Sequence, residues 1–177
     1  MKALLDTCVV VDFLQKCEPF AQDALSLFRA AALQEFSGYI TAKSATDIFY
    51  LSHRATHSNE QSRLLLQRLL DLVGMLDILG TDVRLALLAE CADFEDAVMI
   101  ETAKRSGMGC IVTRNTKHYA GASIPVYEPA EFLRLLLLAQ EQLANNNLES
   151  ARSEADVMKD LGISETDIDA AEDVEIE

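Results

Sequence analysis

The chain has no uninterrupted apolar stretch approaching the about 18 residues that a membrane-spanning helix requires. Only Met-Lys-Ala-Leu-Leu precedes Asp6, which is too short for the apolar region of a secretion signal. The four cysteines show neither CxxC spacing nor a zinc-binding pattern, so we expect reduced thiols that mostly fill the core. Together these absences predict a cytoplasmic protein that makes no contact with a membrane.

The sequence also lacks the motifs that identify several common α/β enzymes. No GxGxxG follows the first apolar run and no GxxxxGK[ST] is present, so neither a dinucleotide site nor a nucleoside triphosphate loop is indicated. No GxSxG marks a nucleophilic serine. His53 and His57 have the spacing of some metal ligands, but their segment is polar and lacks HExxH, so we interpret them as a solvated helix end or loop.

Negative charge is concentrated near the C-terminus. The formal net charge is −14, but 12 of the 29 acids and only 2 of the 15 bases lie in residues 141–177. Residues 1–140 therefore carry 17 acids against 13 bases, a balance that leaves nucleic-acid binding open. We expect one domain over residues 1–140, followed by an acidic tail, helical or disordered, over residues 141–177. In the tail, Asn145 to Asn147 are expected to form a break before a helix at 148–161.

Short apolar runs alternate with amphipathic segments through the first part of the chain. The runs predict strands at residues 2–5, 39–41, 75–79, 109–113 and 124–127. The segments between and after them predict helices at 18–36, 44–51, 63–73, 81–92, 97–107 and 130–138. This alternation predicts a three-layer α/β/α sandwich around a five-stranded parallel sheet, in which Pro125 marks the last strand as an edge.

Acidic residues recur where these strands lead into helices. Asp6 follows the first strand, Asp47 lies in the first turn of the helix after the second, and Asp96 begins the helix before the fourth. Ligands bind at the carboxyl ends of strands in open parallel sheets, so we expect these side chains to converge. Helix capping is the alternative for each: Asp6 as an N-cap, Ser44 with Asp47 as a capping box, and Asp93 as an N-cap supported by Asp96.

Converging carboxylates imply a particular chemistry. They raise one another's pKa values unless a cation lies between them, and oxygen donors without clustered His or Cys favour Mg²⁺ or Mn²⁺. Because magnesium also binds phosphate oxygens, such a site suggests phosphoryl transfer or phosphodiester hydrolysis.

Six segments in order along residues 1–138 resemble successive motifs of PIN-domain proteins: LLDTCVVVDFL, CEPF, SATDIFYL, DFEDAVMIETA, IVTRNTKHY and IPVYEPAEFL. The resemblance implies a compact α/β/α sandwich and a Mg²⁺- or Mn²⁺-dependent endoribonuclease acting on RNA. Many bacterial members are toxins of type II toxin–antitoxin pairs of the VapC type. A protein antitoxin and a homodimer are therefore the partners that it implies.

The resemblance also implies site residues. Asp6 matches the first-strand acid, Asp47 the second acid, which is more often Glu, and Asp96 the third, with Asp93 as a neighbour that assists. The implied metal ligands are Asp6, Asp96 and Asp93. The implied catalytic residues are Asp6, Asp47, Asp96 and Asn115, where Asn115 stands in the place of a fourth Asp in many members.

The sequence departs from the family pattern in ways that keep a second interpretation open. Asn115 is neutral, His118 stands where related sequences often carry a further Asp, and Cys8 replaces a common Asn, while Thr113 matches the family's hydroxyl residue. These departures allow a catalytically degenerate PIN domain that binds RNA or protein as a regulatory module. Arg114 and Lys117 either contact RNA phosphates or are simply solvated.

Overall fold

The computed structural model describes residues 1–89, 91 and 93–150. The five strands are β1 Lys2–Leu5, β2 Ser37–Thr41, β3 Gly74–Leu76, β4 Cys110–Val112 and β5 Val126–Tyr127. The helices are α1 Thr7–Gln15, α2 Ala21–Ala32, α3 Ala42–Thr56, α4 Asn59–Leu70, α5 Gly80–Ala86, α6 Phe94–Arg105 and α7 Pro129–Ser150, with a 3₁₀ turn, η1, at Thr116–Tyr119. The part of the tail helix expected beyond residue 150 lies outside the described residues.

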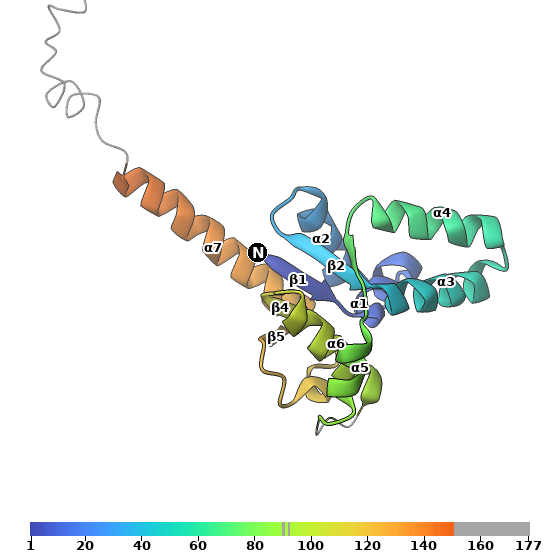
Figure 1. The fold of residues 1–177 in the computed structure, drawn as a ribbon. Coiled ribbons are helices and arrows are strands. Elements are labelled where there is room, and N and C mark those ends of the chain that lie inside the picture. Colours follow the sequence, from blue (N-terminus) through green and yellow to red (C-terminus); the bar gives the residue numbers. More distant parts are fainter. Residues whose placement is uncertain (90, 92, 151–177) are drawn as a thin grey trace, which may run out of the picture. The chain divides into compact units, whose positions relative to one another are not determined.

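The five strands form one parallel sheet in the order β3-β2-β1-β4-β5. This confirms the predicted fold class, including β5 at an edge (Figure 1). From β1 the chain builds β2 and β3 on one side and then β4 and β5 on the other. The strand order thus reverses between β1 and β4, and the crevice beyond their carboxyl ends is where such sheets bind ligands.

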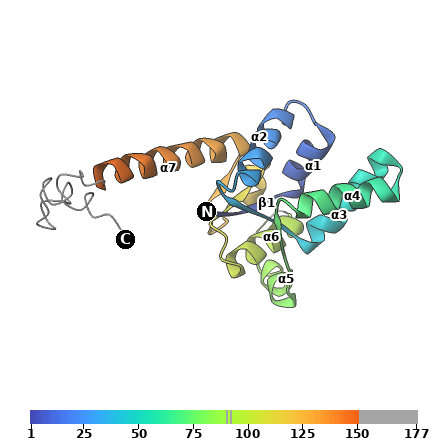
Figure 2. The same ribbon diagram turned by 90° about the horizontal axis from the view of Figure 1, so that it is seen from above.

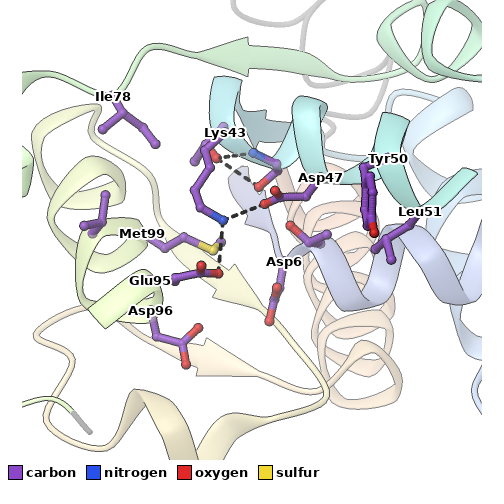
Figure 3. Close-up of a pocket in the computed structure, with 13 residues that line it drawn as sticks. Asp6, Lys43, Asp47, Tyr50, Leu51, Ile78, Glu95, Asp96 and Met99 are labelled. Atoms are coloured by element: carbon purple, nitrogen blue, oxygen red, sulfur yellow. Dashed lines mark hydrogen bonds and ion pairs between the residues drawn. The ribbon is translucent and has the colours of Figure 1, made fainter. Parts of the chain in front are cut away.

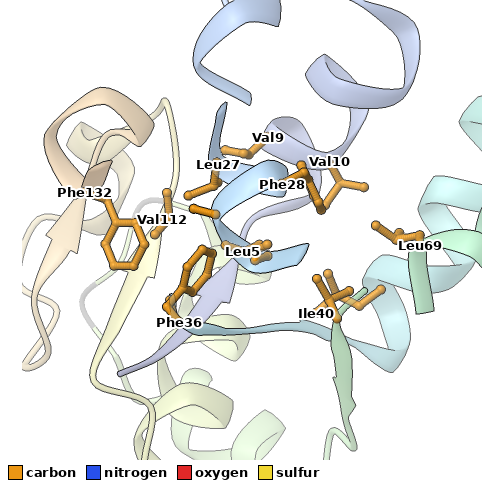
Figure 4. Close-up of a cluster of buried hydrophobic side chains, with 14 of the residues drawn as sticks. Leu5, Val9, Val10, Leu27, Phe28, Phe36, Ile40, Leu69, Val112 and Phe132 are labelled. Atoms are coloured by element: carbon orange, nitrogen blue, oxygen red, sulfur yellow. The ribbon is translucent and has the colours of Figure 1, made fainter. Parts of the chain in front are cut away.

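Alternation along the strands assigns the two faces of the sheet. Leu5 and Val112 point to a core formed with α1, α2 and α7 (Figure 4). Leu4 and Ile111, one residue earlier on each strand, point to the opposite core and pack against α6. Figure 2 shows α1 and α2 on one side of the sheet and α5 and α6 on the other. These are the predicted helical layers on both faces.

Several predicted boundaries were wrong. The cap of α3 is Thr41, whose Oγ1 accepts a hydrogen bond from the Ser44 backbone N–H at 3.0 Å, so Ser44 does not begin the helix. Strand β3 ends at Leu76 rather than residue 79, and α5 ends at Ala86 rather than residue 92. No break occurs at Asn145, because each asparagine costs a helix well under 1 kcal/mol and α7 continues to Ser150.

The chain divides by its packing into two units, residues 1–136 and 137–177. The first holds the sheet and both cores. Among the helices of the described residues, none is long and apolar enough to cross a membrane. The functional division proposed at residue 140 stays a prediction.

Candidate active site

A pocket of about 330 Å³ lies at the carboxyl edge of the sheet between α3 and α6. Asp6, Asp47 and Asp96 all line it, together with Glu95 and Lys43 (Figure 3). The structure therefore brings three of the predicted acids into one place, although they are 41 and 49 residues apart in sequence. Within the described residues, Asp93 and Asn115 are not among those that line this pocket.

Asp6 is the most firmly held of these acids. It follows β1 and caps α1, where its Oδ1 accepts from the Cys8 backbone N–H at 3.3 Å. Its Oδ2 accepts from Thr113 Oγ1 at 2.6 Å and from the Tyr119 hydroxyl at 3.4 Å. Only 8% of the residue is exposed. The capping interpretation is thus correct for Asp6, and the same carboxylate also points into the pocket at the switch point of the sheet.

The neighbours of Asp6 are neutral donors. Burial, followed by the charge of Asp6, raises the pKa of the Cys8 thiol to about 11, so the thiol stays protonated and donates to Asp6 Oδ2 at 3.3 Å. Burial and the charges of Asp6 and Asp96 also raise the pKa of Tyr119. Cys8 therefore supplies a donor where the family pattern has Asn. Tyr119 was missed because only the fold brings η1 to this acid.

Asp96 experiences unbalanced negative charge. Burial raises its pKa above the ordinary 3.8, and the nearby charges of Asp6 and Asp93 raise it further. The Tyr119 hydroxyl and His118 act on this pKa in the opposite direction, with His118 Nδ1 lying 3.3 Å from Asp96 Oδ2. Among the described residues, no lysine or arginine pairs with Asp96 to offset the charges of Asp6 and Asp93.

Asp93 caps α6, as the capping interpretation expected. Its Oδ1 accepts from the backbone N–H groups of Glu95 at 2.8 Å and Asp96 at 3.4 Å. Asp93, Asp96 and His118 each offer one ligand atom, and these atoms lie within 4.8 Å of one another. His118, read from the sequence only as a departure from the family, therefore lies beside two predicted metal ligands. The sequence carried no local signal for this placement.

Asp47 is paired within the protein. Its Oδ2 accepts from Lys43 Nζ at 2.6 Å, and the same ammonium lies 3.0 Å from Glu95 Oε2. Burial lowers the pKa of Lys43, but the hydrogen bonds with Asp47 and Glu95 outweigh this effect and raise it overall. Sequence reasoning missed Lys43 and Glu95. The four-residue spacing of Lys43 and Asp47 was the one signal available for the pair.

The polar residues after β4 have other surroundings. Asn115 is exposed, and its backbone N–H donates to Thr113 Oγ1 at 3.0 Å. Arg114 pairs with buried Asp12 at 2.8 Å, and its guanidinium lies 4.8 Å from the centre of the Phe20 ring. Arg114 therefore ties the segment after β4 to Asp12 and Phe20. It is not simply solvated, which was one of the two interpretations of the sequence. Lys117 is exposed.

The donor set fits a divalent cation. Asp6 and Asp96 supply carboxylate oxygens in one pocket, and Asp93 and His118 each place a ligand atom close to Asp96. A cation near Asp96 would offset the repulsion that raises the pKa of this residue. Carboxylate oxygens suit Mg²⁺ and Mn²⁺.

Parallel strands with acids at the switch point define an α/β protein with an acidic site at the carboxyl edge of its sheet. Residues 2–117 match the family model described as PIN domain. The match covers more than half of the chain, so the chain belongs to the PIN-domain family, as its motifs predicted. Among proteins of curated function, none matches the sequence.

Several solved structures share the fold, and one of them is a toxin–antitoxin complex. VapBC2 from Rickettsia felis, bound to a DNA fragment from its promoter, contains a chain 16% identical with a TM-score of 0.55, and the alignment covers 72% of this chain and 98% of that one. A toxin–antitoxin complex from Klebsiella pneumoniae contains a chain 20% identical with a TM-score of 0.54, and the alignment covers 72% of this chain and 97% of that one. FitAcB from Neisseria gonorrhoeae contains a chain 18% identical with a TM-score of 0.55, with coverages of 72% and 97%. At these identities the likeness establishes the fold alone.

Proposed function

We propose that this protein is a Mg²⁺- or Mn²⁺-dependent endoribonuclease, the VapC-like toxin of a type II toxin–antitoxin pair. The observation that carries the proposal is the convergence of Asp6, Asp47 and Asp96 on one pocket at the switch point of a PIN-domain sheet. The similar structure from Klebsiella pneumoniae is a toxin–antitoxin complex, which supports a protein antitoxin as partner. An RNA substrate, a homodimer and a cytoplasmic location belong to the same proposal.

In this proposal Asp6 and Asp96 hold the metal, assisted by Asp93. A divalent ion bound there would supply an activated water and would stabilise the leaving oxygen of a phosphodiester. Thr113 keeps Asp6 Oδ2 in place through its 2.6 Å hydrogen bond. Asp47 directs Oδ2 to Lys43, so Oδ1 is the atom assigned to orient the attacking water and accept its proton.

Cleavage of RNA tests the proposal directly. Purified protein is incubated with RNA and Mn²⁺ beside an Asp96→Asn variant, which keeps the shape of the side chain but removes its charge. We expect cleavage by the wild-type protein and its loss in the variant. Equal cleavage by both would identify a contaminating nuclease.

A catalytically degenerate PIN domain that binds RNA or protein remains a second candidate. It is favoured by Asn115, because its side chain is a neutral amide and supplies no carboxylate after β4. It is also favoured by the pairing of Asp47 with Lys43. Thermal unfolding separates the candidates: Mn²⁺ raises the melting temperature of a metal-binding enzyme, whereas an unchanged temperature supports the binding module.

A further inference from the structure

Lys43 connects the two walls of the pocket. It lies in the first turn of α3, and its Nζ reaches Asp47 on the same helix at 2.6 Å and Glu95 in the first turn of α6 at 3.0 Å. Figure 3 shows this side chain extending between Asp47 and Glu95, with Asp6 and Asp96 lower in the view. One positive charge therefore occupies the Asp47–Glu95 end of an otherwise acidic pocket.

The position of Lys43 is electrostatically unfavourable for its own helix. The N-terminus of α3 carries unsatisfied N–H groups and a partial positive charge, so a cation in this turn is repelled. Local helix stability does not explain a lysine here. Its two acid partners, Asp47 on the same helix and Glu95 on α6, explain the lysine, because both line the pocket.

The side chain also remains available to a ligand. It is 41% exposed, and an ammonium has three N–H donors, of which Asp47 and Glu95 use two. No acceptor in the described part of the chain takes the third, which leaves it for an incoming anion. A phosphate oxygen entering the pocket is an acceptor of the right charge.

The charges at the two ends of the pocket differ accordingly. Asp6 and Asp96 line the pocket at one end, and among the described residues neither pairs with a lysine or an arginine. At the other end, the acids Asp47 and Glu95 already share an ammonium. A divalent ion is therefore favoured at the first end and repelled from the second.

We propose that Lys43 serves as a built-in second cation: it restricts the pocket to one divalent ion, at Asp6 and Asp96, and contacts a phosphate of the bound RNA. This proposal rests on the proposed nuclease function for the identity of the phosphate. The restriction to one ion is independent of activity. A purely structural lysine would tie α3 to α6 and affect neither the ion count nor RNA binding.

Isothermal titration of the full metal-free chain with Mn²⁺ tests the ion count. We expect one ion per chain for wild type, two for Lys43→Met, in which Asp47 and Glu95 are released, and one for Lys43→Arg. Lys104→Met is the matched control, because Lys104 pairs with Glu101 on the surface at 2.8 Å and is 39% exposed. Circular dichroism establishes that each variant is folded. Two ions in wild type, none in wild type, or one in Lys43→Met would overturn the proposal.

The salt dependence of RNA binding tests the phosphate contact. Binding of a fluorescent single-stranded RNA is measured over a salt series with Mn²⁺ present. Each lysine substitution is made in the Asp96→Asn variant so that the RNA is not cleaved during the measurement. Loss of one phosphate contact lowers the slope of log K against log salt by about 0.7 for a single strand. We expect this change for Lys43→Met and not for Lys104→Met. An unchanged slope, or no RNA binding, would overturn the phosphate contact.

The two proposals fail separately. The nuclease function would be refuted, and the restriction to one ion retained, if wild type binds one Mn²⁺ but cleaves no RNA and Lys43→Met binds two. A wild-type protein that cleaves RNA but shows the same ion count in Lys43→Met would refute the role of Lys43 alone.

Discussion

The two ends of helix α6 handle negative charge in opposite ways. Near its C-terminus, Arg105 donates from Nε to Asp82 Oδ1 at 2.7 Å and from Nη2 to Asp82 Oδ2 at 2.9 Å. Thr102 and the backbone N–H of Leu79 complete the hydrogen bonding of this buried carboxylate. At the N-terminus, Asp96 lies close to other acids, and its pKa is raised by burial and by their charge.

This difference separates structural acids from acids available to a ligand. Asp82 has a fixed cation and a lowered pKa, chiefly because of its hydrogen bonds with Arg105, so its charge supports the fold. Asp96 has no comparable arginine or lysine partner among the described residues. The first arrangement anchors α6 against α5, and the second presents uncompensated charge to the pocket.

The largest expected effect is on catalysis. Replacing Asp96 by Asn removes a proposed metal ligand, so the rate of RNA cleavage should fall at least about 100-fold, beyond the 10–100-fold cost of losing an outer partner of a metal ligand. Asp82→Asn should keep its specific activity when assayed while folded. Equal losses of specific activity in the two variants would contradict the contrast between the ends of α6.

The next effect is the response of stability to metal. Mn²⁺ at 100 times its dissociation constant should raise the free energy of unfolding by about 2.7 kcal/mol. Differential scanning calorimetry should show this for wild type and for Asp82→Asn, and not for Asp96→Asn. A full response in Asp96→Asn would place the ion elsewhere.

A somewhat smaller effect concerns the structural acid. Asp82→Asn removes the ionic hydrogen bonds with Arg105 and should lower the free energy of unfolding by about 2 kcal/mol, since hydrogen bonds to charged groups contribute about 1.5–3 kcal/mol. Arg105 is 34% exposed, which keeps the loss below that of a fully buried pair. Urea unfolding of the metal-free proteins at pH 7 measures it. Destabilisation by Asp96→Asn of the same size would remove the distinction.

The smallest effect is the pH dependence of the free energy of unfolding that Asp82→Asn loses. The folded protein holds the pKa of Asp82 below its usual 3.8. Between the folded and the unfolded pKa of Asp82, the unfolded state binds more protons, so the free energy of unfolding falls as pH falls. The stability that Asp82 contributes is therefore complete well above pH 3.8 and declines below it. Urea unfolding at pH 7, 4 and 3 should show the gap between wild type and Asp82→Asn narrowing toward pH 3. A constant gap would assign the loss to packing.

The sequence predicted the architecture because strand and helix periodicities are local. Short apolar runs located all five strands, and acids at strand ends pointed to the pocket lined by Asp6, Asp47 and Asp96. Boundaries were less predictable: Thr41 and Ser44 are both good caps, and only the end of β2 selects Thr41.

The remaining site residues depend on contacts between distant segments. Lys43 meets Glu95 across 52 residues, and Tyr119 meets Asp6 across 113. Neither pairing leaves a pattern in the local sequence. Whether Asp93 and Asn115 act as the resemblance implied stays a prediction, and their positions at a helix cap and on an exposed loop now separate them from the pocket lining.

Because Asp6 both starts a helix and faces the pocket, the choice of substitution there decides how an inactive protein can be produced. Asparagine caps a helix about as well as aspartate, whereas alanine costs about 0.5–2 kcal/mol at such a position. If the proposed toxin function holds, Asp6→Asn should therefore yield a harmless, folded chain for expression in a host that the native protein would poison. Asp6→Ala would confuse loss of chemistry with fraying of the segment that begins at Thr7.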